Sequence, residues 1–460
     1  MQNIDKMKKE KDLHAELARR RYHKPNPFFY FIYYVVGRTK LLGAKYHPHF
    51  EKIDNIGKHK GPAFLIWNHQ SRRDHTFLCT AAWPRRINIV CEYNEFFRSH
   101  LAWALRHNQI LPKKVYCNND IPGMRAMRDI IQKGGIVALS PEGNSSMFGD
   151  NQPIVPGTGR FLQAFKVPVF MAYTKGAYLT NTKHDEGDRI GQCFITTKLL
   201  FTPEDLKKMS PQEIDDKINL EFHHDDYKWN KEHHIKYKAP NGEIAKGFET
   251  ILYRCPKCGT EYKMIAKKNY IKCTQCNNGA SIDDEYNFHK FDGTCRIPDT
   301  PSDWVHEERQ IIIDDIRKDP NYSYSVNVKL GYLPKDHLIE NHEVSEHCGD
   351  GVFTVDHKGV HYKGTRHGEP WSFDMDYNRI WTFNVPVDMS TFGIYVNEEF
   401  YEFIPETKSI TKLLLLTEEM HRLHINRFKN FPWFDYMYEG KELGIDLKSE
   451  PKIKETKKAK

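Results

Sequence analysis

Apolar residues between positions 60 and 225 fall alternately into short continuous runs and into helix-spaced patterns. Runs at Ala63–Trp67, Ile87–Cys91 and Ile136–Leu139 predict buried strands. The same patterns predict two further strands, at Val167–Tyr173 and Cys193–Phe201. They also predict helices at Pro122–Gln132 and Pro211–Phe222, and a turn at Pro203–Met209. Strands that alternate with helices indicate an α/β domain with a mixed sheet flanked by helices.

The pattern changes character after residue 300. A helix is expected to begin after Ser302, and alternating apolar residues predict strands from about 320 to 405, with a turn at His357–Gly359. One long helix is expected at Lys408–Phe428. The C-terminal part is therefore predicted to be a β-rich domain that ends in a helix. In topology alone it resembles a pleckstrin-homology-like (GRAM-type) module, which binds lipids or partners. A purely structural β domain is the alternative.

The amino-terminal 45 residues combine basic and aromatic stretches. A charged, partly helical leader covers residues 1–26, and the aromatic run Phe28–Val36 follows, with Arg38, Lys40 and Lys45 behind it. Aromatic rings between basic residues suit the headgroup region of a membrane. The run is too short to span a bilayer, which takes about 20 apolar residues. A helix buried against the domain's own core is the alternative.

Composition narrows the cellular setting. The chain has 460 residues, 39% of them apolar, and a formal net charge of +7. This mild charge permits contact with anionic lipid or nucleic acid and requires neither. The charged N-terminus does not resemble a secretory signal, so the ten cysteines indicate a reducing compartment. We expect a cytoplasmic protein that is peripherally associated with the membrane.

The first candidate for chemistry directly follows the strand Ala63–Trp67, in the segment Asn68-His69-Gln70-Ser71-Arg72-Arg73-Asp74. At the end of a strand in an α/β sheet, His69 and Asp74 would form a general base and the carboxylate that orients it. Such a pair takes a proton from an attacking hydroxyl. The spacing alone is weak evidence, because His49 and Asp54 have the same spacing. That second pair lies in a charged connector, where we expect no catalytic role.

The second candidate lies about 70 residues further on, where the strand Ile136–Leu139 leads into Ser140-Pro141-Glu142-Gly143-Asn144-Ser145-Ser146. A glycine after a strand lets the backbone approach a ligand closely. Glu142 and the hydroxyl groups of the loop suit a polyol. An ordinary polar turn is the alternative interpretation.

Together these segments resemble the glycerolipid acyltransferase family (lysophosphatidic-acid-acyltransferase-like, PlsC-type). The family's N-H-x-S-x-x-D motif is matched by Asn68, His69, Ser71 and Asp74. Its P-E-G-T-R-S loop is matched by Pro141, Glu142, Gly143 and Ser146. Its G-x-I-x-x-x-R segment is matched by Ile110 and Lys114, with Asn108 in place of the glycine. Its Val-Pro-Val strand is matched by Val167-Pro168-Val169.

The resemblance covers about residues 45 to 220. It implies transfer of a fatty acyl group from acyl-CoA or acyl-carrier protein to a hydroxyl of a glycerolipid-type acceptor, such as 1-acyl-glycerol-3-phosphate, in phospholipid synthesis or remodelling. It also implies His69 as general base and Asp74 as its orienting partner. Residues implied in substrate binding are Asn68, Ser71, Arg72, Lys114, Glu142, Gly143 and Ser146.

One position departs from the family pattern. The Thr-Arg of the family's acceptor loop is Asn144-Ser145 in this chain. That arginine would pair with the phosphate of the acceptor, which a guanidinium group binds with two hydrogen bonds. Lys114, Arg72 and Arg73 are the candidates to replace it. Alternatively, the acceptor lacks a glycerol-3-phosphate headgroup.

A separate pattern of cysteines predicts a metal site. Cys255 and Cys258 form one C-x-x-C pair, and Cys273 and Cys276 form a second after 14 intervening residues. This spacing is typical of a zinc ribbon, in which four thiolates fill the tetrahedral shell of a structural Zn²⁺. A ribbon of this size cannot build its own core, so we expect metal binding to supply its folding energy. The nearby residues Lys263, Lys267, Lys268, Tyr270 and Lys272 form a basic and aromatic face that is compatible with nucleic acid. A solvated face is the favoured interpretation, and nucleic acid is not an expected partner.

These observations predict five segments. They are a basic leader and aromatic membrane-interface segment (1–45), an acyltransferase domain (46–235), a zinc ribbon (250–285), a C-terminal β and helix domain (300–440) and a disordered Lys-rich tail (441–460). The expected partners are a membrane lipid surface, the acyl donor and the acceptor, and the sequence does not indicate an oligomeric state. The rival hypothesis is a zinc-ribbon binding or scaffold protein with a degenerate acyltransferase fold.

Overall fold

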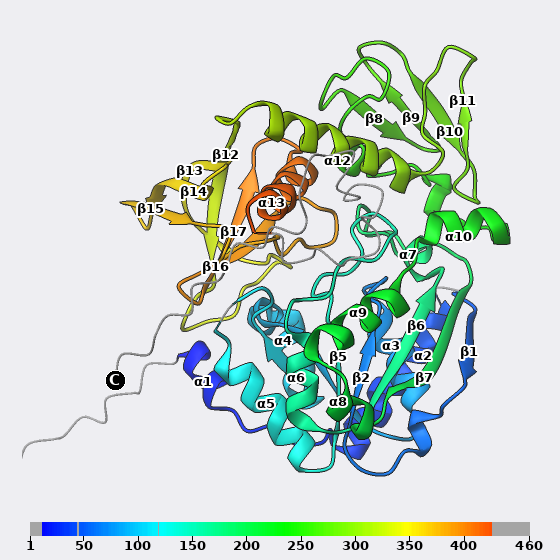
Figure 1. Ribbon diagram of the computed structural model, residues 1–460, viewed down its shortest axis with the longest axis vertical. Helices are drawn as coiled ribbons and strands as arrows, with labels where there is room; N and C mark the ends of the chain where they lie inside the picture. Colours follow the sequence, from blue (N-terminus) through cyan, green and yellow to red (C-terminus); the bar gives the residue numbers. More distant parts are fainter. Residues whose placement is uncertain (1–11, 44–45, 118, 426–460) are drawn as a thin grey trace, which may run out of the picture.

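The α/β part of the chain is built on one mixed sheet (Figure 1). The computed structural model describes residues 12–43, 46–117 and 119–425. The strands of this sheet are β1 (Pro48–Lys52), β2 (Ala63–Trp67), β3 (Ile87–Glu92), β4 (Leu111–Lys113), β5 (Ile136–Leu139), β6 (Val169–Lys175) and β7 (Cys193–Phe201). Their order is β1-β7-β6-β2-β5-β3-β4, and β7 runs antiparallel to β6. The predicted mixed sheet is confirmed.

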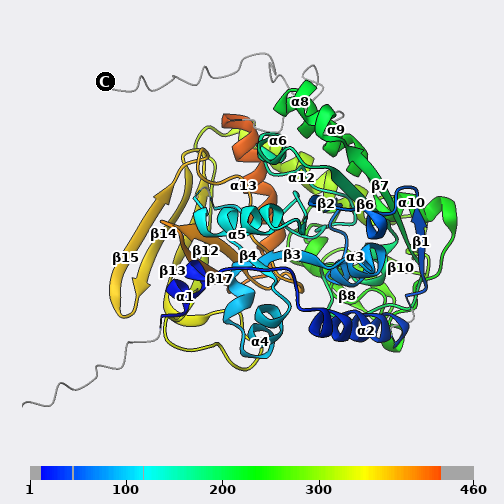
Figure 2. The same cartoon turned by 90° about the horizontal axis from the view of Figure 1, so that it is seen from below.

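The alternation of apolar side chains on β2 explains the two helical layers. Phe64 and Ile66 enter one apolar cluster, whereas Leu65 and Trp67 enter another on the opposite face. Helices that cover the first face are α5 (Ile121–Gln132), α6 (Thr158–Phe165), α8 (Pro203–Lys208) and α9 (Pro211–Phe222). Helices that cover the second face are α1 (Leu13–Arg19), α2 (Pro27–Gly43), α3 (Asp74–Ala82) and α4 (Ser99–His107). Figure 2 shows the sheet between these layers.

The cysteine-rich segment and the C-terminal part each form an antiparallel sheet. The first is β8 (Met264–Lys267), β9 (Tyr270–Cys273), β10 (Gly279–Ile282) and β11 (Phe288–Lys290). The second is β12 (Ser323–Tyr332), β13 (Glu346–Asp356), β14 (Gly359–Arg366), β15 (Glu369–Met375), β16 (Phe392–Val396) and β17 (Glu399–Pro405). The connecting and covering helices are α7 (Ala177–Thr180), α10 (Asp226–His233), α11 (Phe248–Ile251), α12 (Pro301–Lys318) and α13 (Ile410–His424). The predicted β-rich domain is confirmed, and its pleckstrin-homology-like character stays a prediction.

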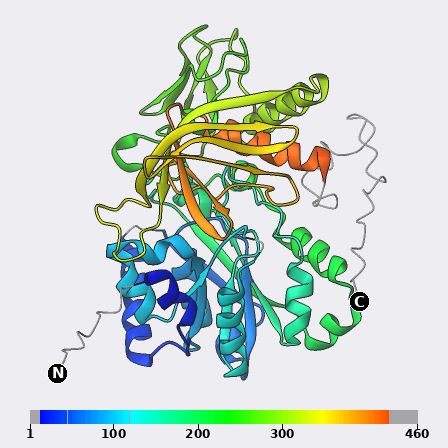
Figure 3. The same cartoon turned by 90° about the vertical axis from the view of Figure 1, so that its left-hand side faces the viewer.

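The six-stranded sheet sits over the α/β sheet, with the ribbon beyond it (Figure 3). One apolar cluster runs through all three parts. It includes Met147 and Phe148 from the α/β domain, Ile271 from the ribbon, and Leu413 and Leu416 from α13. The ribbon therefore shares a core with its neighbours.

Some predicted boundaries were wrong. The segment Pro203–Met209 is mostly helix α8, because Thr202 and Asp205 form a capping box and Pro203 suits the first helical turn. Strand β6 begins at Val169, after Pro168. His49 lies in edge strand β1 and stacks on Phe194, so it is not in a connector.

Two further predictions concern the ends of the chain. Helix α13 ends at His424, and the predicted Lys-rich tail lies outside the described residues. The aromatic run Phe28–Val36 forms part of helix α2. Among the residues that the structure describes, no helix combines the length and the apolar character that crossing a membrane requires.

Candidate active site

His69 and Asp74 lie together at the carboxyl end of β2. Nδ1 of His69 is 2.8 Å from Oδ2 of Asp74, and the same oxygen accepts hydrogen bonds from the N–H groups of Gln70 and Ser71. An oxygen that already accepts two N–H groups favours a proton on Nδ1, which leaves Nε2 as the basic nitrogen. Asp74 is buried, and that burial raises its pKa while the hydrogen bond with His69 opposes the rise. The geometry matches a general base with its orienting carboxylate.

The loop after β5 holds the backbone of His69 from both sides. The N–H of His69 donates to Oε2 of Glu142 at 2.6 Å, and its carbonyl accepts from the N–H of Ser146 at 2.6 Å. The second oxygen of Glu142 accepts from the N–H of Gln152 at 3.3 Å. Burial raises the pKa of Glu142 to about 8, and the two backbone N–H groups act in the opposite direction. The two motifs, far apart in sequence, therefore form one site.

Gly143 allows a close approach in the same loop. Its φ is +83°, and a Cβ there would lie 2.7 Å from the hydroxyl oxygen of Tyr116. That hydroxyl donates to the carbonyl of Glu142 and accepts from the N–H of Asn144. A residue other than glycine would be strained and would displace Tyr116.

Asn68 and Ser71 use their side chains within the protein. The Asn68 amide exchanges hydrogen bonds with the backbone of Thr174, at 2.9 and 2.7 Å. Ser71 Oγ accepts from the N–H of Arg73 and lies 3.3 Å from Oδ1 of Asn181. Sequence inspection did not identify Thr174 or Asn181, because neither belongs to a motif. The substrate-binding roles expected for Asn68, Ser71, Glu142, Gly143 and Ser146 stay predictions, whereas their positioning roles are visible in these contacts.

The basic residues expected to replace the missing arginine are engaged elsewhere. Arg72 and Arg73 both pair with Asp188, at 3.1 and 2.8 Å. Lys114 donates to the carbonyl of Glu398 at 2.6 Å and lies over the Tyr93 ring. Their predicted contact with an acceptor stays untested.

Lys183, which sequence inspection missed, lies beside the position of the missing arginine. Its ammonium is 3.0 Å from Oγ of Ser145, and the residue is only 6% exposed. No carboxylate of the described residues lies within ion-pair distance of it. Desolvation lowers the pKa of Lys183 to about 7. The negative charge of Asp388 opposes this shift, and a bound anion beside the amine would oppose it further.

The C-terminal domain covers this end of the sheet. Asn144 Nδ2 donates to the carbonyl of Phe383 at 2.7 Å, so the loop after β5 is bound to the C-terminal domain. Tyr395 donates to Oε1 of Glu92, at the end of β3, at 2.9 Å. In Figure 3 the yellow and orange strands of the C-terminal domain lie above the α/β domain.

Comparison with known proteins classifies the α/β part. Residues 47–174 match the family model described as Acyltransferase. This segment is an acyltransferase domain. The resemblance expected from the motifs is thereby confirmed for this part of the chain, and His69, Asp74 and Glu142 all lie within the matched range.

One similar solved structure is the 1-acyl-sn-glycerophosphate (LPA) acyltransferase PlsC from Thermotoga maritima. It is 19% identical, with a TM-score of 0.34, and the match covers 41% of this chain and 74% of that chain. No curated protein matches the chain.

The four predicted metal ligands come together beyond the acyltransferase domain. The sulfur atoms of Cys255, Cys258, Cys273 and Cys276 all lie within 4.8 Å of one another, and two pairs are 3.6 and 3.8 Å apart. Thiolates at about 2.3 Å from a tetrahedral Zn²⁺ would be roughly 3.8 Å apart. The donor set and its spacing fit zinc, and no position is left for a substrate.

Proposed function

We propose that this chain is an O-acyltransferase that works at a membrane surface. It would move a fatty acyl group from an acyl-CoA or acyl-carrier-protein thioester to a hydroxyl of a glycerolipid-type acceptor. The observation that carries the proposal is the His69–Asp74 pair, held by Glu142 and Ser146 within an acyltransferase domain. A degenerate scaffold is disfavoured because this geometry is intact.

The chemistry follows from the free nitrogen of His69. Nε2 takes the proton of the acceptor hydroxyl as its oxygen attacks the thioester carbonyl carbon. The tetrahedral intermediate collapses when the C–S bond breaks, and the imidazolium returns the proton to the leaving thiolate. Asp74 stabilises the imidazolium without taking its proton. Ester and free thiol are the products, so atoms and charge balance.

A direct assay tests this proposal. The purified chain is incubated with an acyl-CoA and 1-acyl-glycerol-3-phosphate, and the released thiol and the new ester are both measured. Wild-type protein should form both products in equal amounts. His69→Ala should lower the rate by about 10²–10⁴-fold. His49→Ala, the control with the same spacing to an aspartate, should leave it unchanged. Wild-type turnover in His69→Ala would remove His69 from the mechanism.

We further propose that Lys183 binds the phosphate of the acceptor. It is buried, it lacks a carboxylate partner, and it contacts Ser145, which stands in place of the family's arginine. Ser146, the next residue, donates to the carbonyl of His69, so an anion beside Lys183 would lie next to the loop that holds the general base. An ammonium would hold the phosphate as a point charge.

Acceptors with and without a phosphate test this role. Lys183→Met should reduce kcat/KM for a lysophosphatidic acid by about tenfold or more, since a charge-assisted hydrogen bond contributes roughly 1.5–3 kcal/mol. It should change the rate for a monoacylglycerol little, and Lys183→Arg should retain most of the activity. Equal losses for both acceptors would show that Lys183 is structural.

The ribbon would hold one structural Zn²⁺ through Cys255, Cys258, Cys273 and Cys276. A tetrahedral site filled by protein has no open coordination position, so the ion would supply folding stability only. Catalysis depends on His69 and Asp74 in a different part of the chain.

Membrane association would use the exposed face of α2. Tyr30 is buried against the domain, whereas Phe28, Phe31, Ile32 and Val36 are exposed by 66%, 51%, 42% and 45%. Trp103 of α4, near Phe29 in space, is 62% exposed. One face of α2 therefore packs on the domain's own core, whereas the opposite face is exposed and available to a membrane. A helix with an exposed apolar and aromatic face suits the headgroup boundary.

A further inference from the structure

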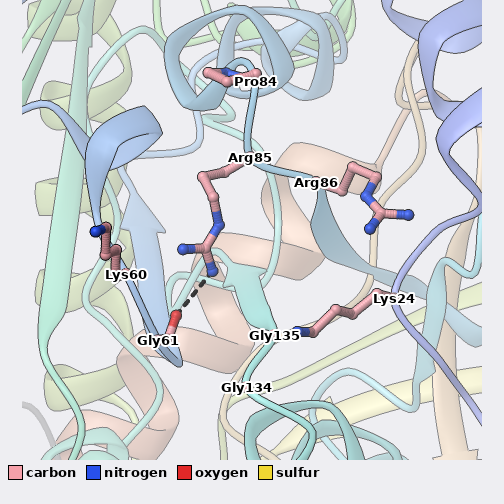
Figure 4. Close-up of a pocket in the computed structure, with 8 residues that line it drawn as sticks. All are labelled: Lys24, Lys60, Gly61, Pro84, Arg85, Arg86, Gly134 and Gly135. Carbon is pink, nitrogen blue, oxygen red and sulfur yellow. Dashed lines mark hydrogen bonds between the residues drawn. The ribbon is translucent and has the colours of Figure 1, made fainter.

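A basic pocket lies at the opposite end of the acyltransferase domain from the catalytic pair. Its lining residues precede strands: Gly61 comes before β2, Arg86 before β3 and Gly135 before β5. His69 and Glu142, in contrast, follow strands β2 and β5. The pocket has a volume of about 470 Å³ (Figure 4). It is therefore separate from the proposed catalytic site.

The charge of this pocket has one sign. Lys24, Lys60, Arg85 and Arg86 line it, and none of the lining residues is acidic. Like charges gathered without a carboxylate create a positive potential that attracts an anion.

The arginines and the lysines have different roles here. Arg85 donates to the backbone carbonyls of His59 and Gly61, and Arg86 to that of Pro25. These bonds fix the guanidinium groups in the wall of the pocket. Within the described part of the chain, the ammonium groups of Lys24 and Lys60 have no hydrogen-bond or ion-pair partner, and both residues are exposed. Their exposed ammonium groups are therefore available to an incoming anion.

The pocket is continuous with the start of the α2 face. Lys24 lies three residues before α2. Trp83, directly before Pro84 of the pocket, stacks on Tyr34 of α2 with 4.3 Å between the ring centroids. The ring centroid of Phe31 is 6.0 Å from that of Trp83. The turn that forms the pocket thus also supports the aromatic helix. Further along, α2 packs closely on α3: a Cβ added at Gly37 would lie 3.2 Å from Cγ2 of Thr76. Thr76 comes two residues after Asp74, so α2 extends from the pocket towards the proposed catalytic pair.

We propose that this pocket binds the phosphate of an anionic phospholipid headgroup and fixes the orientation of the enzyme on the membrane. The apolar face beside it favours a lipid over a free phosphate, because only a lipid would place a phosphate and acyl chains side by side. The inference rests on the proposed membrane association, which it deepens by naming a specific headgroup site.

Charge reversal tests the site. Lys24→Glu/Lys60→Glu is compared with Lys267→Glu/Lys268→Glu, which makes the same change in net charge on the ribbon. Both proteins are sedimented with phosphatidylcholine vesicles that contain phosphatidylglycerol. The pocket variant should bind about thirtyfold more weakly than wild type, because each basic residue near an anionic surface contributes about 1 kcal/mol. The ribbon variant should bind the vesicles less than about threefold more weakly than wild type. Both variants should acylate a water-soluble short-chain acceptor at the wild-type rate.

Each other outcome has a definite meaning. Equal losses in the two variants would show diffuse attraction and overturn the pocket. Binding of inorganic phosphate to the wild-type protein in calorimetry, with vesicle binding unchanged in the pocket variant, would make it a free-phosphate site and overturn the lipid assignment. Phe31→Ser/Val35→Ser separates the two proposals. If that variant loses vesicle binding while the pocket variant does not, the headgroup site alone is wrong, and if it keeps wild-type binding, membrane association through α2 is wrong.

Discussion

At the scale of single residues, the site depends on how oxygen atoms of buried carboxylates are shared. One oxygen of Asp74 accepts from His69, Gln70 and Ser71, so the same atom orients the imidazole and closes the turn before α3. Glu142 divides its two oxygens between the N–H groups of His69 and Gln152. Both carboxylates therefore act on His69, Asp74 through its ring and Glu142 through its backbone.

Asp74→Asn tests the orienting role. Asparagine has one acceptor oxygen and one NH₂ group, so it cannot accept hydrogen bonds at both positions as the carboxylate does. The tautomer of His69 with the proton on Nδ1 and a free Nε2 is then no longer stabilised. We expect kcat to fall by about 10³-fold or more, with little change in fold. Asp54→Asn is the matched control, since Asp54 has the same spacing from His49. Its carboxylate accepts from the N–H of Leu199 and, among the described residues, from no histidine. A wild-type rate for Asp74→Asn would contradict the assignment.

Glu142→Gln tests the positioning role. The substitution turns one of two acceptor oxygens into an NH₂ group that faces a backbone N–H. Loss of a buried hydrogen bond with an unsatisfied donor costs about 1–3 kcal/mol, so the melting temperature and kcat should both fall. Glu221→Gln, at a partly exposed pair with Lys198, should change neither. If the melting temperature of Glu142→Gln equals that of wild type, the bonds to His69 and Gln152 are not stabilising.

At the scale of elements, the ribbon combines a candidate metal site with shared packing. Its strands place Cys273 and Ile271 in the same apolar cluster as α13, and Lys412 of α13 pairs with Glu261 at 2.7 Å. Packing with neighbours thus adds to whatever stability the metal gives. A bound ion would deprotonate the four thiols and hold their sulfur atoms in one site, and so would add its own contribution to stability.

Removal of zinc should loosen this element alone. The pure protein should contain one Zn²⁺ per chain, and Cys258→Ser should lower that content. Chelation should increase hydrogen exchange over about residues 250–285 while β2 stays protected, because β2 belongs to a different core. Absence of zinc from the purified protein would refute the site. Immediate loss of turnover on chelation, with exchange unchanged, would mean that the metal takes part in catalysis.

At the scale of the whole molecule, buried polar contacts join the C-terminal domain to the end of the acyltransferase domain that carries His69 and Asp74. Glu92 accepts from Tyr395 across this junction, and burial raises the pKa of Glu92 to about 8. The folded protein consequently keeps a proton on Glu92 at pH values where the unfolded chain has lost it. Stability from this group is complete below pH 4.5 and is lost as the pH rises towards 8.

Glu92→Gln tests this link. Glutamine keeps an acceptor for Tyr395 but does not titrate. Between pH 5 and 7 the free energy of unfolding of wild type should fall by roughly 2 kcal/mol more than that of the variant. Denaturant unfolding of both proteins across this range measures the difference, with Glu221→Gln as a control that should follow wild type. Parallel curves for wild type and Glu92→Gln would show that Glu92 is ionised in the folded protein.

Much of the local structure was predictable. The bounds of β2, β5, β7 and α9 follow directly from runs and spacings of apolar residues. The hairpin around His357–Gly359 was also predicted, and β13 and β14 pair across it. These features depend on neighbours in sequence, so a local pattern is sufficient. The capping box of α8, formed by Thr202 and Asp205, is equally local, and it makes a helix of the segment that apolar spacing alone predicted to be a turn.

The sequence by itself determined the candidate residues for the chemistry: the His69–Asp74 pair, the Glu142 loop and the four cysteines, each recognised by spacing within a short segment. Only the tertiary structure decided how they are used. It joined Glu142 to the backbone of His69, brought Lys183 to Ser145, laid the C-terminal domain over the site and gathered Lys24, Lys60 and Arg85 around one pocket. The physical reason is that strand order and the packing of distant loops set these contacts, and hydrophobic patterns within a single segment do not encode which segments become neighbours.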